Sequence, residues 1–120
     1  MTVLRIVANI AVPDPELARE FYQKLLGLDL VMDHGWIMTL GSGASTVPQL
    51  NVAEEGGSGT PVPDLSIEVD NVDLIYRRAR SAQLEILYGI IDEPWGVRRF
   101  FVRDPYGVVL NILTHRTSEG

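Results

Sequence analysis

Apolar residues fall into short blocks separated by turn-forming residues along the whole chain. The block at 4–12 has little polar interruption, which predicts a buried strand. Residues 13–15 end this strand, and Asp14 suits a helix N-cap because Pro15 follows it at the first helical position. The expected helix stops at Gly27, where a left-handed residue would end it. Its apolar stripe consists of Leu17, Phe21, Leu25 and Leu26.

The remaining blocks predict more strands and a second helix. Strands are expected at 28–32, 36–40 and 47–53, and the glycine-rich segment 54–63 is expected to be a flexible linker. A strand at 64–69 then precedes a helix that opens at residues 70–71, followed by a strand at 84–87. Residues 93–113 predict a loop, a strand, a tight turn at 104–107 and a final strand. The apolar stripe of the second helix consists of Val72, Ile75, Tyr76 and Ala79.

The chain contains an internal repeat. Adding 57 to a position in the first half finds its mate in the second, as with Ile10 and Ile67, and near the end of each half the offset is 60, as with Asn51 and Asn111. Each half therefore predicts β-α-β-β-β, an α+β fold of two tandem modules within one domain. Module one is expected at about 3–53, the linker at 54–63 and module two at about 64–114, before a short C-terminal tail. Neither half can bury its apolar faces alone, so the halves are expected to pack together or to exchange between chains.

Composition excludes several classes of protein. A chain of 120 residues with 46% apolar content suits one domain with a hydrophobic core. The absence of cysteine excludes disulfides, thiolate nucleophiles and cysteine-ligated metals. The net charge of −6 argues against a nucleic-acid partner, which requires a basic face. No apolar run is long enough to cross a membrane, and the first residues do not resemble a signal peptide, so we expect a cytoplasmic protein.

Several short motifs in order carry a family resemblance. The first half has residues 12–14, then Phe21-Tyr22 and residues 26–28; the second has residues 67–70, then Trp95-Gly96 and the turn at 104–107. On the duplicated pattern, the chain resembles the vicinal oxygen chelate superfamily, which includes glyoxalase I, extradiol dioxygenases, fosfomycin-resistance enzymes and bleomycin-resistance proteins. The resemblance covers nearly the whole chain and implies the fold more strongly than any chemistry.

The resemblance also implies where a metal would be held. In metal-dependent members, strands of both halves line a U-shaped cavity, and His or carboxylate side chains complete an octahedral site. Carried over, these positions are Val7, Asn51, Asp64 and Asn111; Val7 lies seven residues before Asp14, and the repeat relates it to Asp64. Val7 cannot coordinate, and the amides of Asn51 and Asn111 are weak ligands for Fe, Mn, Ni or Zn. We therefore expect no metal cofactor of the usual kind.

The same positions are candidates for a ligand-binding cavity. Asp64 is either a turn carboxylate or a ligand-facing anion. Asn51 and Asn111 are polar in apolar strands, so they need partners if buried: a ligand, water or each other. Glu68 alternates with Asp64 along one strand and shares its face; otherwise it is an exposed strand residue.

Aromatic and basic residues complete the candidate set. Trp36 is a candidate for either core or cavity, and Trp95, in a loop, is expected at the cavity rim. If Arg103 pairs with Val108 across the turn, then Arg98 and Phe100 share the face of Asn111, although a bulge would reverse this. Alternation allows only one of the adjacent residues Arg98 and Arg99 to face the cavity.

Three functions are weighed on these grounds. The first is a cytoplasmic homodimer, swapped or side by side, that sequesters a cationic or aromatic drug or metabolite, as the bleomycin-resistance branch does. The alternative is a glyoxalase-like lyase, isomerase or dioxygenase with an atypical metal site or none, and with Asp64 or Glu68 as general base. A dimeric ferredoxin-like domain with no ligand is the third.

Overall fold

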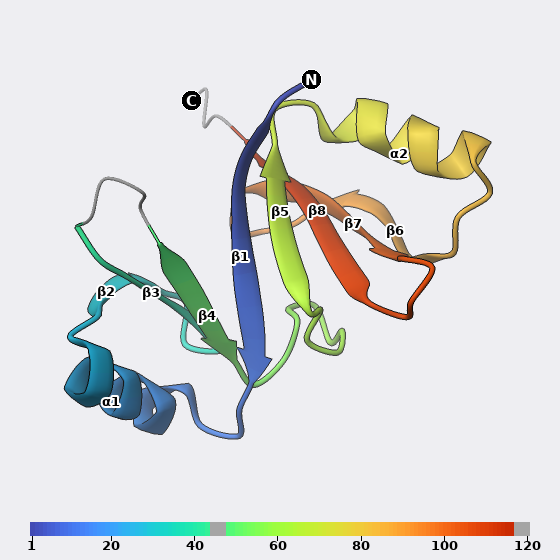
Figure 1. The fold of residues 1–120 in the computed structure, drawn as a ribbon. Coiled ribbons are helices and arrows are strands. Elements are labelled where there is room, and N and C mark those ends of the chain that lie inside the picture. The colour runs from blue at the N-terminus through green and yellow to red at the C-terminus, as the bar shows by residue number, and fades with distance from the viewer. Residues whose placement is uncertain (44–47, 117–120) are drawn as a thin grey trace. The chain divides into compact units, whose positions relative to one another are not determined.

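The computed structural model describes residues 1–43 and 48–116, and its elements follow the order β-α-β-β-β twice (Figure 1). The α+β class and the duplicated pattern expected from the repeat are confirmed. Residue 47 of one predicted strand and the end of the predicted tail lie outside the described residues. The elements are β1 (Val3–Ala11), α1 (Pro15–Leu26), β2 (Asp29–Asp33), β3 (Ile37–Gly41), β4 (Gln49–Ala53), β5 (Leu65–Val69), α2 (Val72–Ser81), β6 (Ile86–Asp92), β7 (Val97–Arg103) and β8 (Val109–His115).

The chain divides into two compact units that share strand β1. The N-terminal unit is Val7–Val62, and the C-terminal unit comprises Met1–Ile6 and Pro63–Gly120. Strand order is β2-β3-β4-β1 in the first and β1-β5-β8-β7-β6 in the second. The first residues of β1 therefore pack with the second half of the chain, whereas the repeat assigned all of β1 to module one.

Local sequence signals set the ends of both helices. The Asp14 side chain accepts a hydrogen bond from the Glu16 N–H (3.0 Å), and Gly27 adopts φ 68° while its N–H bonds the Gln23 carbonyl. The side chain of Asn71 caps α2 in the same way. The predicted N-cap and C-terminal glycine of α1 are confirmed.

The main apolar core lies in the C-terminal unit, where α2 covers one face of its strands (Figure 1). The predicted stripe of α2 faces these strands, and Tyr76 meets Phe100 edge to face with ring centroids 4.9 Å apart. The helix therefore covers this face of the strands. The buried residues of this core are Val69, Val72, Ala79, Phe100, Val102 and Ile112.

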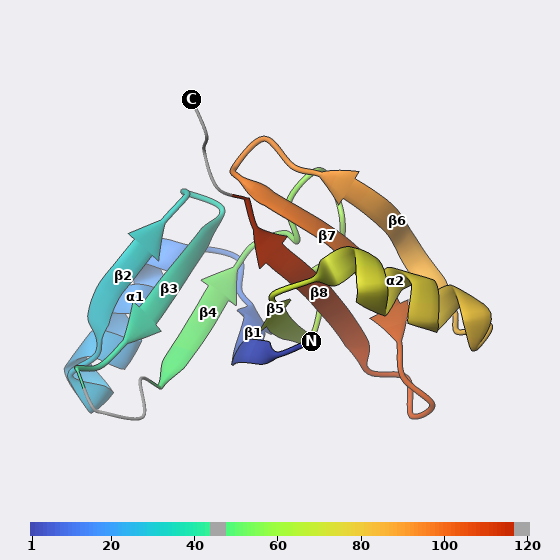
Figure 2. The same ribbon diagram turned by 90° about the horizontal axis from the view of Figure 1, so that it is seen from above.

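Helix α1 contacts β3 and β4 in the N-terminal unit (Figure 2), but few of its own apolar side chains are buried by that contact. Pro15 is its only buried residue, and Ala18 and Tyr22 are half-buried. Its predicted apolar stripe stays 57–64% exposed. No helix among the described residues is long and apolar enough to span a membrane.

The segment expected to be a flexible linker contains a closed turn. The Gly56 N–H donates to the Thr60 carbonyl (2.8 Å), and the Thr60 N–H donates to the Gly57 carbonyl (3.0 Å). Gly56 and Gly57 are buried. These bonds give the glycines defined positions that the sequence, read as a linker, does not suggest.

Candidate functional site

The register between β7 and β8 decides which side chains share the face of Asn111. Arg103 pairs with Val109, so the predicted pairing of Arg103 with Val108 is wrong. The cause lies in the turn, where the Asp104 carboxylate accepts a hydrogen bond from the Val108 N–H (2.9 Å) and keeps Val108 out of the strand.

This register moves two predicted site residues to the other face. Phe101, not Phe100, lies opposite Asn111. Phe100 is fully buried in the core beneath α2, and Arg98 donates to Asp73 of α2 (3.0 Å). The hydrogen bond from Arg98 lowers the pKa of the Asp73 carboxyl. Arg98 and Phe100 therefore belong to the helix-covered face.

Asn51 is the centre of a closed polar cluster in the N-terminal unit. The pairing of β4 with β1 and β3 places it between Asn9 and Thr39. The Thr39 hydroxyl donates to Asn51 Oδ1 (2.6 Å), and Asn51 Nδ2 donates to Asn9 Oδ1 (2.7 Å). Val7, two residues before Asn9 on the same face, is 2% exposed. Both polar atoms of the Asn51 amide are therefore engaged.

Asn111 occupies the corresponding place in the C-terminal unit, but its cluster is incomplete. It is 8% exposed, and its Nδ2 donates to the Ser66 hydroxyl (3.1 Å), the counterpart of the bond to Asn9. Phe101 takes the place of Thr39 and offers no donor. Among the described residues, Asn111 Oδ1 has no hydrogen-bond partner. In the first half of the repeat, both polar atoms of the asparagine side chain are thus hydrogen-bonded. In the second half, the buried oxygen of Asn111 has no donor among the described residues.

The two predicted acidic site residues of β5 are already engaged. Asp64 is exposed, and its carboxylate accepts the Val109 N–H (2.8 Å) at the start of β8. Glu68, half-buried, lies 3.1 Å from Arg5 Nε and 2.7 Å from His115 Nδ1. Asp64 therefore fixes a strand end, and Glu68 links three elements of the C-terminal unit.

A buried ion pair lies beside Asn111 in the same unit. Arg99 and Glu93 are 2% and 3% exposed, with Nη2 and Oε2 2.6 Å apart. The guanidinium carbon lies 4.7 Å from the Phe101 ring centroid, 4.8 Å from that of Trp95 and 5.3 Å from that of Tyr88. Arg99 is thus held by one carboxylate and three aromatic rings. Trp95, predicted at a rim, is half-buried against this guanidinium.

Trp36 makes contacts within the N-terminal unit. It is half-buried just before β3, its carbonyl accepts the Glu54 N–H (3.0 Å), and its ring stacks with His34 at 6.4 Å. Sequence reasoning missed Asn9 and Ser66, although the repeat relates them and both are polar in apolar strands. It also missed the ion pair, because residues 93 and 99 carry no local sign of burial.

The arrangement is that of a duplicated α+β protein with a buried asparagine, Asn51 or Asn111, at the same place in each half. Within residues 1–43 and 48–116, no three His, Cys, Asp or Glu side chains gather as a metal site would require. A family profile described as Glyoxalase/Bleomycin resistance protein/Dioxygenase superfamily matches residues 3–112. The chain belongs to this superfamily.

Solved structures share the fold at low identity. A protein described as NAD-dependent benzaldehyde dehydrogenase from Legionella pneumophila is 20% identical with a TM-score of 0.77, covering 93% of this chain and 100% of its own. Methylmalonyl-CoA epimerase from Mycobacterium tuberculosis is 20% identical (TM-score 0.65, coverage 96% and 88%). A superfamily member from Vibrio splendidus is 16% identical (TM-score 0.66, coverage 95% and 99%). No curated protein matches the sequence.

Proposed function

We propose that this chain binds a small organic ligand through the strand face around Asn111 and sequesters it, as a drug- or metabolite-resistance protein would. The observation that carries the proposal is the buried Oδ1 of Asn111, which has no donor among the described residues. A buried acceptor without a partner costs about 1–3 kcal/mol. A ligand hydroxyl or amine that donates to this oxygen would remove that cost.

We also infer that this chain works without the metal of its metal-dependent relatives. The residues at the four positions where the family resemblance places metal ligands do not suit a metal ion. Val7 has no donor atom, and both amide atoms of Asn51 are engaged with neighbouring side chains. Asp64 holds a backbone N–H, and Asn111 offers only a neutral oxygen. Such a set is poor for a divalent transition metal.

The chemistry around Asn111 favours a ligand with a donor group and an aromatic part. Phe101 lies opposite Asn111, and the aromatic rings of Trp95 and Tyr88 surround the adjacent Arg99. The Arg99 charge is balanced by Glu93, so this region does not favour an anionic ligand. With a net charge of −6, the protein as a whole attracts cations. A cationic, partly aromatic ligand suits these features.

Titration calorimetry tests this proposal with a cationic glycopeptide antibiotic and, for comparison, succinate. We expect binding heat with the antibiotic, little with succinate, and loss of the antibiotic heat in Asn111→Leu. Glu85→Gln, on the exposed surface, is the matched control and should bind as the wild type does. Succinate binding without antibiotic binding, or unchanged binding by Asn111→Leu, would refute the proposal.

The enzymatic alternative has weaker support. Its candidate bases are Asp64, whose carboxylate holds the Val109 N–H, and Glu68, which is paired with Arg5 and His115. Both carboxylates thus have structural partners. Elemental analysis of protein purified without chelator separates the two functions, because stoichiometric Fe, Mn, Ni or Zn would overturn the metal-free proposal.

We further propose that the chain acts as a cytoplasmic homodimer. Large apolar side chains are exposed in both units, including Ile6 at 61% and Leu25 at 64%, as in chains that bury such surface against a partner. The absence of cysteine is compatible with a reducing compartment. Sedimentation velocity at micromolar concentration gives the oligomeric state directly.

A further inference from the structure

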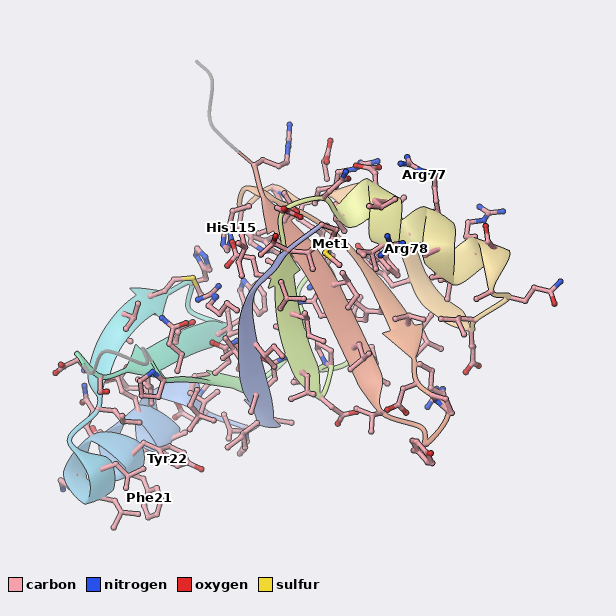
Figure 3. All side chains as sticks on the ribbon, turned by 45° about the horizontal axis from the view of Figure 1, so that its top comes forward. Met1, Phe21, Tyr22, Arg77, Arg78 and His115 are labelled. Carbon is pink, nitrogen blue, oxygen red and sulfur yellow. The ribbon has the colours of Figure 1, made fainter. Side chains whose placement is uncertain are left out.

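Helix α1 carries an apolar stripe on its solvent side. Leu17, Phe21 and Leu25 repeat at intervals of four and are 63%, 57% and 64% exposed. Figure 3 shows Phe21 directed away from the strands of its unit. The other side of the helix packs through Pro15 and Tyr22. This α1 stripe (Leu17, Phe21 and Leu25) is therefore left uncovered in its own unit.

Helix α2, the repeat mate of α1, presents the opposite chemistry. The position that corresponds to Phe21 is Arg78, and Arg77 and Arg80 are exposed beside it. Arg77 and Arg78 are marked on α2 in Figure 3. None of these three guanidinium groups forms a salt bridge with any residue that the structure describes. We call these three residues the arginine face of α2.

The two units also differ in net charge, and the unit that carries α1 is the more acidic. The N-terminal unit has seven acidic and two basic residues, a net charge of −5. Both basic residues lie on α1, which also carries Glu16 and Glu20, so the helix itself is neutral. Glu16 pairs with Arg19 within the helix (3.1 Å). The C-terminal unit has nine acidic and eight basic residues, a net charge of −1, and its arginine face is a local excess of positive charge. An apolar helix in an acidic unit and a helix covered with arginines are complementary surfaces.

We propose that, in the homodimer, the α1 stripe of one protomer packs against the arginine face of α2 in its partner, and that the reverse contact forms by symmetry. Arginine stems cover apolar surface while their charged ends stay in water, so they can lie over Leu17 and Leu25. A guanidinium above the Phe21 ring adds a cation–π contact. Glu20 then lies near an arginine of the partner. This inference rests on the homodimer proposed above.

The area and charge favour this pairing over α1 against a second α1. The exposed parts of the stripe side chains and Leu26 amount to about 400 Å², near half of the roughly 800 Å² per partner in a stable interface. Because each protomer contributes both helices, two symmetric contacts reach that size. Pairing two α1 helices would instead bring together two units of net charge −5.

Charge-exchange variants test the pairing. One variant carries Glu16→Lys and Glu20→Lys, which makes α1 basic and opposes it to the arginines of α2. The other carries Arg77→Glu and Arg78→Glu, which changes the net charge of α2 from +2 to −2 and opposes it to an N-terminal unit of net charge −5. Each variant alone then has repulsive contacts, and its dimer dissociation constant should rise about hundredfold. An equimolar mixture restores two attractive contacts, so it should form a heterodimer near wild-type affinity by sedimentation velocity. Recovery in the mixture also shows that both variants are folded.

The outcomes separate the proposals. A monomeric wild type refutes both the homodimer and this surface, while ligand titration still judges the binding function by itself. A dimeric wild type with either variant unchanged refutes the helix pairing alone. If only the α1 variant dissociates, the interface joins two α1 helices, and if the mixture of two monomeric variants stays monomeric, the charge contact is absent; both results overturn the pairing.

Discussion

The unequal hydrogen bonding of Asn51 and Asn111 predicts opposite effects of the same substitution. Leucine is close to asparagine in size and branching but has no polar atoms. In Asn51→Leu, two hydrogen bonds disappear: the Thr39 hydroxyl loses its acceptor, and Asn9 Oδ1 loses the Asn51 amide as a donor. With about 1–2 kcal/mol for each of these two lost interactions, the cost is about 2–4 kcal/mol.

Asn111→Leu has a different balance. It removes one hydrogen bond, to Ser66, worth about 1 kcal/mol, but also removes the buried oxygen without a donor, whose cost is about 1–3 kcal/mol. We expect a net stabilisation of about 1 kcal/mol in the ligand-free protein. For a chain of this length, about 1 kcal/mol changes the Tm by about 4 °C.

Differential scanning calorimetry of the ligand-free proteins measures both effects. The Tm of Asn111→Leu should rise by about 4 °C, and that of Asn51→Leu should fall by about 8–16 °C. Urea titration gives the same comparison as free energies, with equal slopes if the folded states are alike. Equal destabilisation of both variants would refute the reasoning, because it would mean that Asn111 Oδ1 has a partner in the folded protein.

Two further predictions concern charged pairs. Arg99→Met should destabilise the protein by about 3–5 kcal/mol, since it leaves the buried Glu93 carboxylate without its cation. The double variant Arg99→Met, Glu93→Gln should recover most of this loss in urea denaturation. A double variant no more stable than the single one would contradict this prediction. Because the Arg98 hydrogen bond lowers the pKa of Asp73, this pair stabilises the fold above about pH 4, and the contribution is lost as pH falls further. In Asp73→Asn the Tm should therefore fall less steeply than in the wild type as the pH drops below about 4. The free energy involved is that of an exposed ion pair, about 0.2–1 kcal/mol. An unchanged dependence of Tm on pH would count against the pairing.

Local signals predicted the elements well, because caps and periodicity act over a few residues. Asp14 and Gly27 end α1 where the sequence places them. The register of the last hairpin was not predictable from alternation, because one side chain, that of Asp104, holds an additional residue in the turn. That single shift exchanges Phe100 for Phe101 on the face of Asn111.

The candidate site was predictable only in part, for similar reasons. The repeat identified Asn51 and Asn111 as equivalent, and their register in the two units agrees with that. The repeat did not reveal that the side-chain oxygen of Asn51 has a hydrogen-bond donor while that of Asn111 has none among the described residues. The difference arises from strand neighbours 12 and 10 positions away in the sequence, Thr39 and Phe101. Apolar periodicity in α1 likewise indicated a helix but not that the side with Phe21 would stay exposed.

The division of β1 between two units bears on how the duplication can have persisted. Val3 to Ile6 pack with the second half, and Thr2 and Asp70 exchange hydrogen bonds there, although the first half encodes all of these strand residues. A gene shortened to its second repeat would lose the strand that lies beside β5. The C-terminal unit thus depends on a strand that the first repeat encodes, so the first repeat is not dispensable even where its own chemistry has changed.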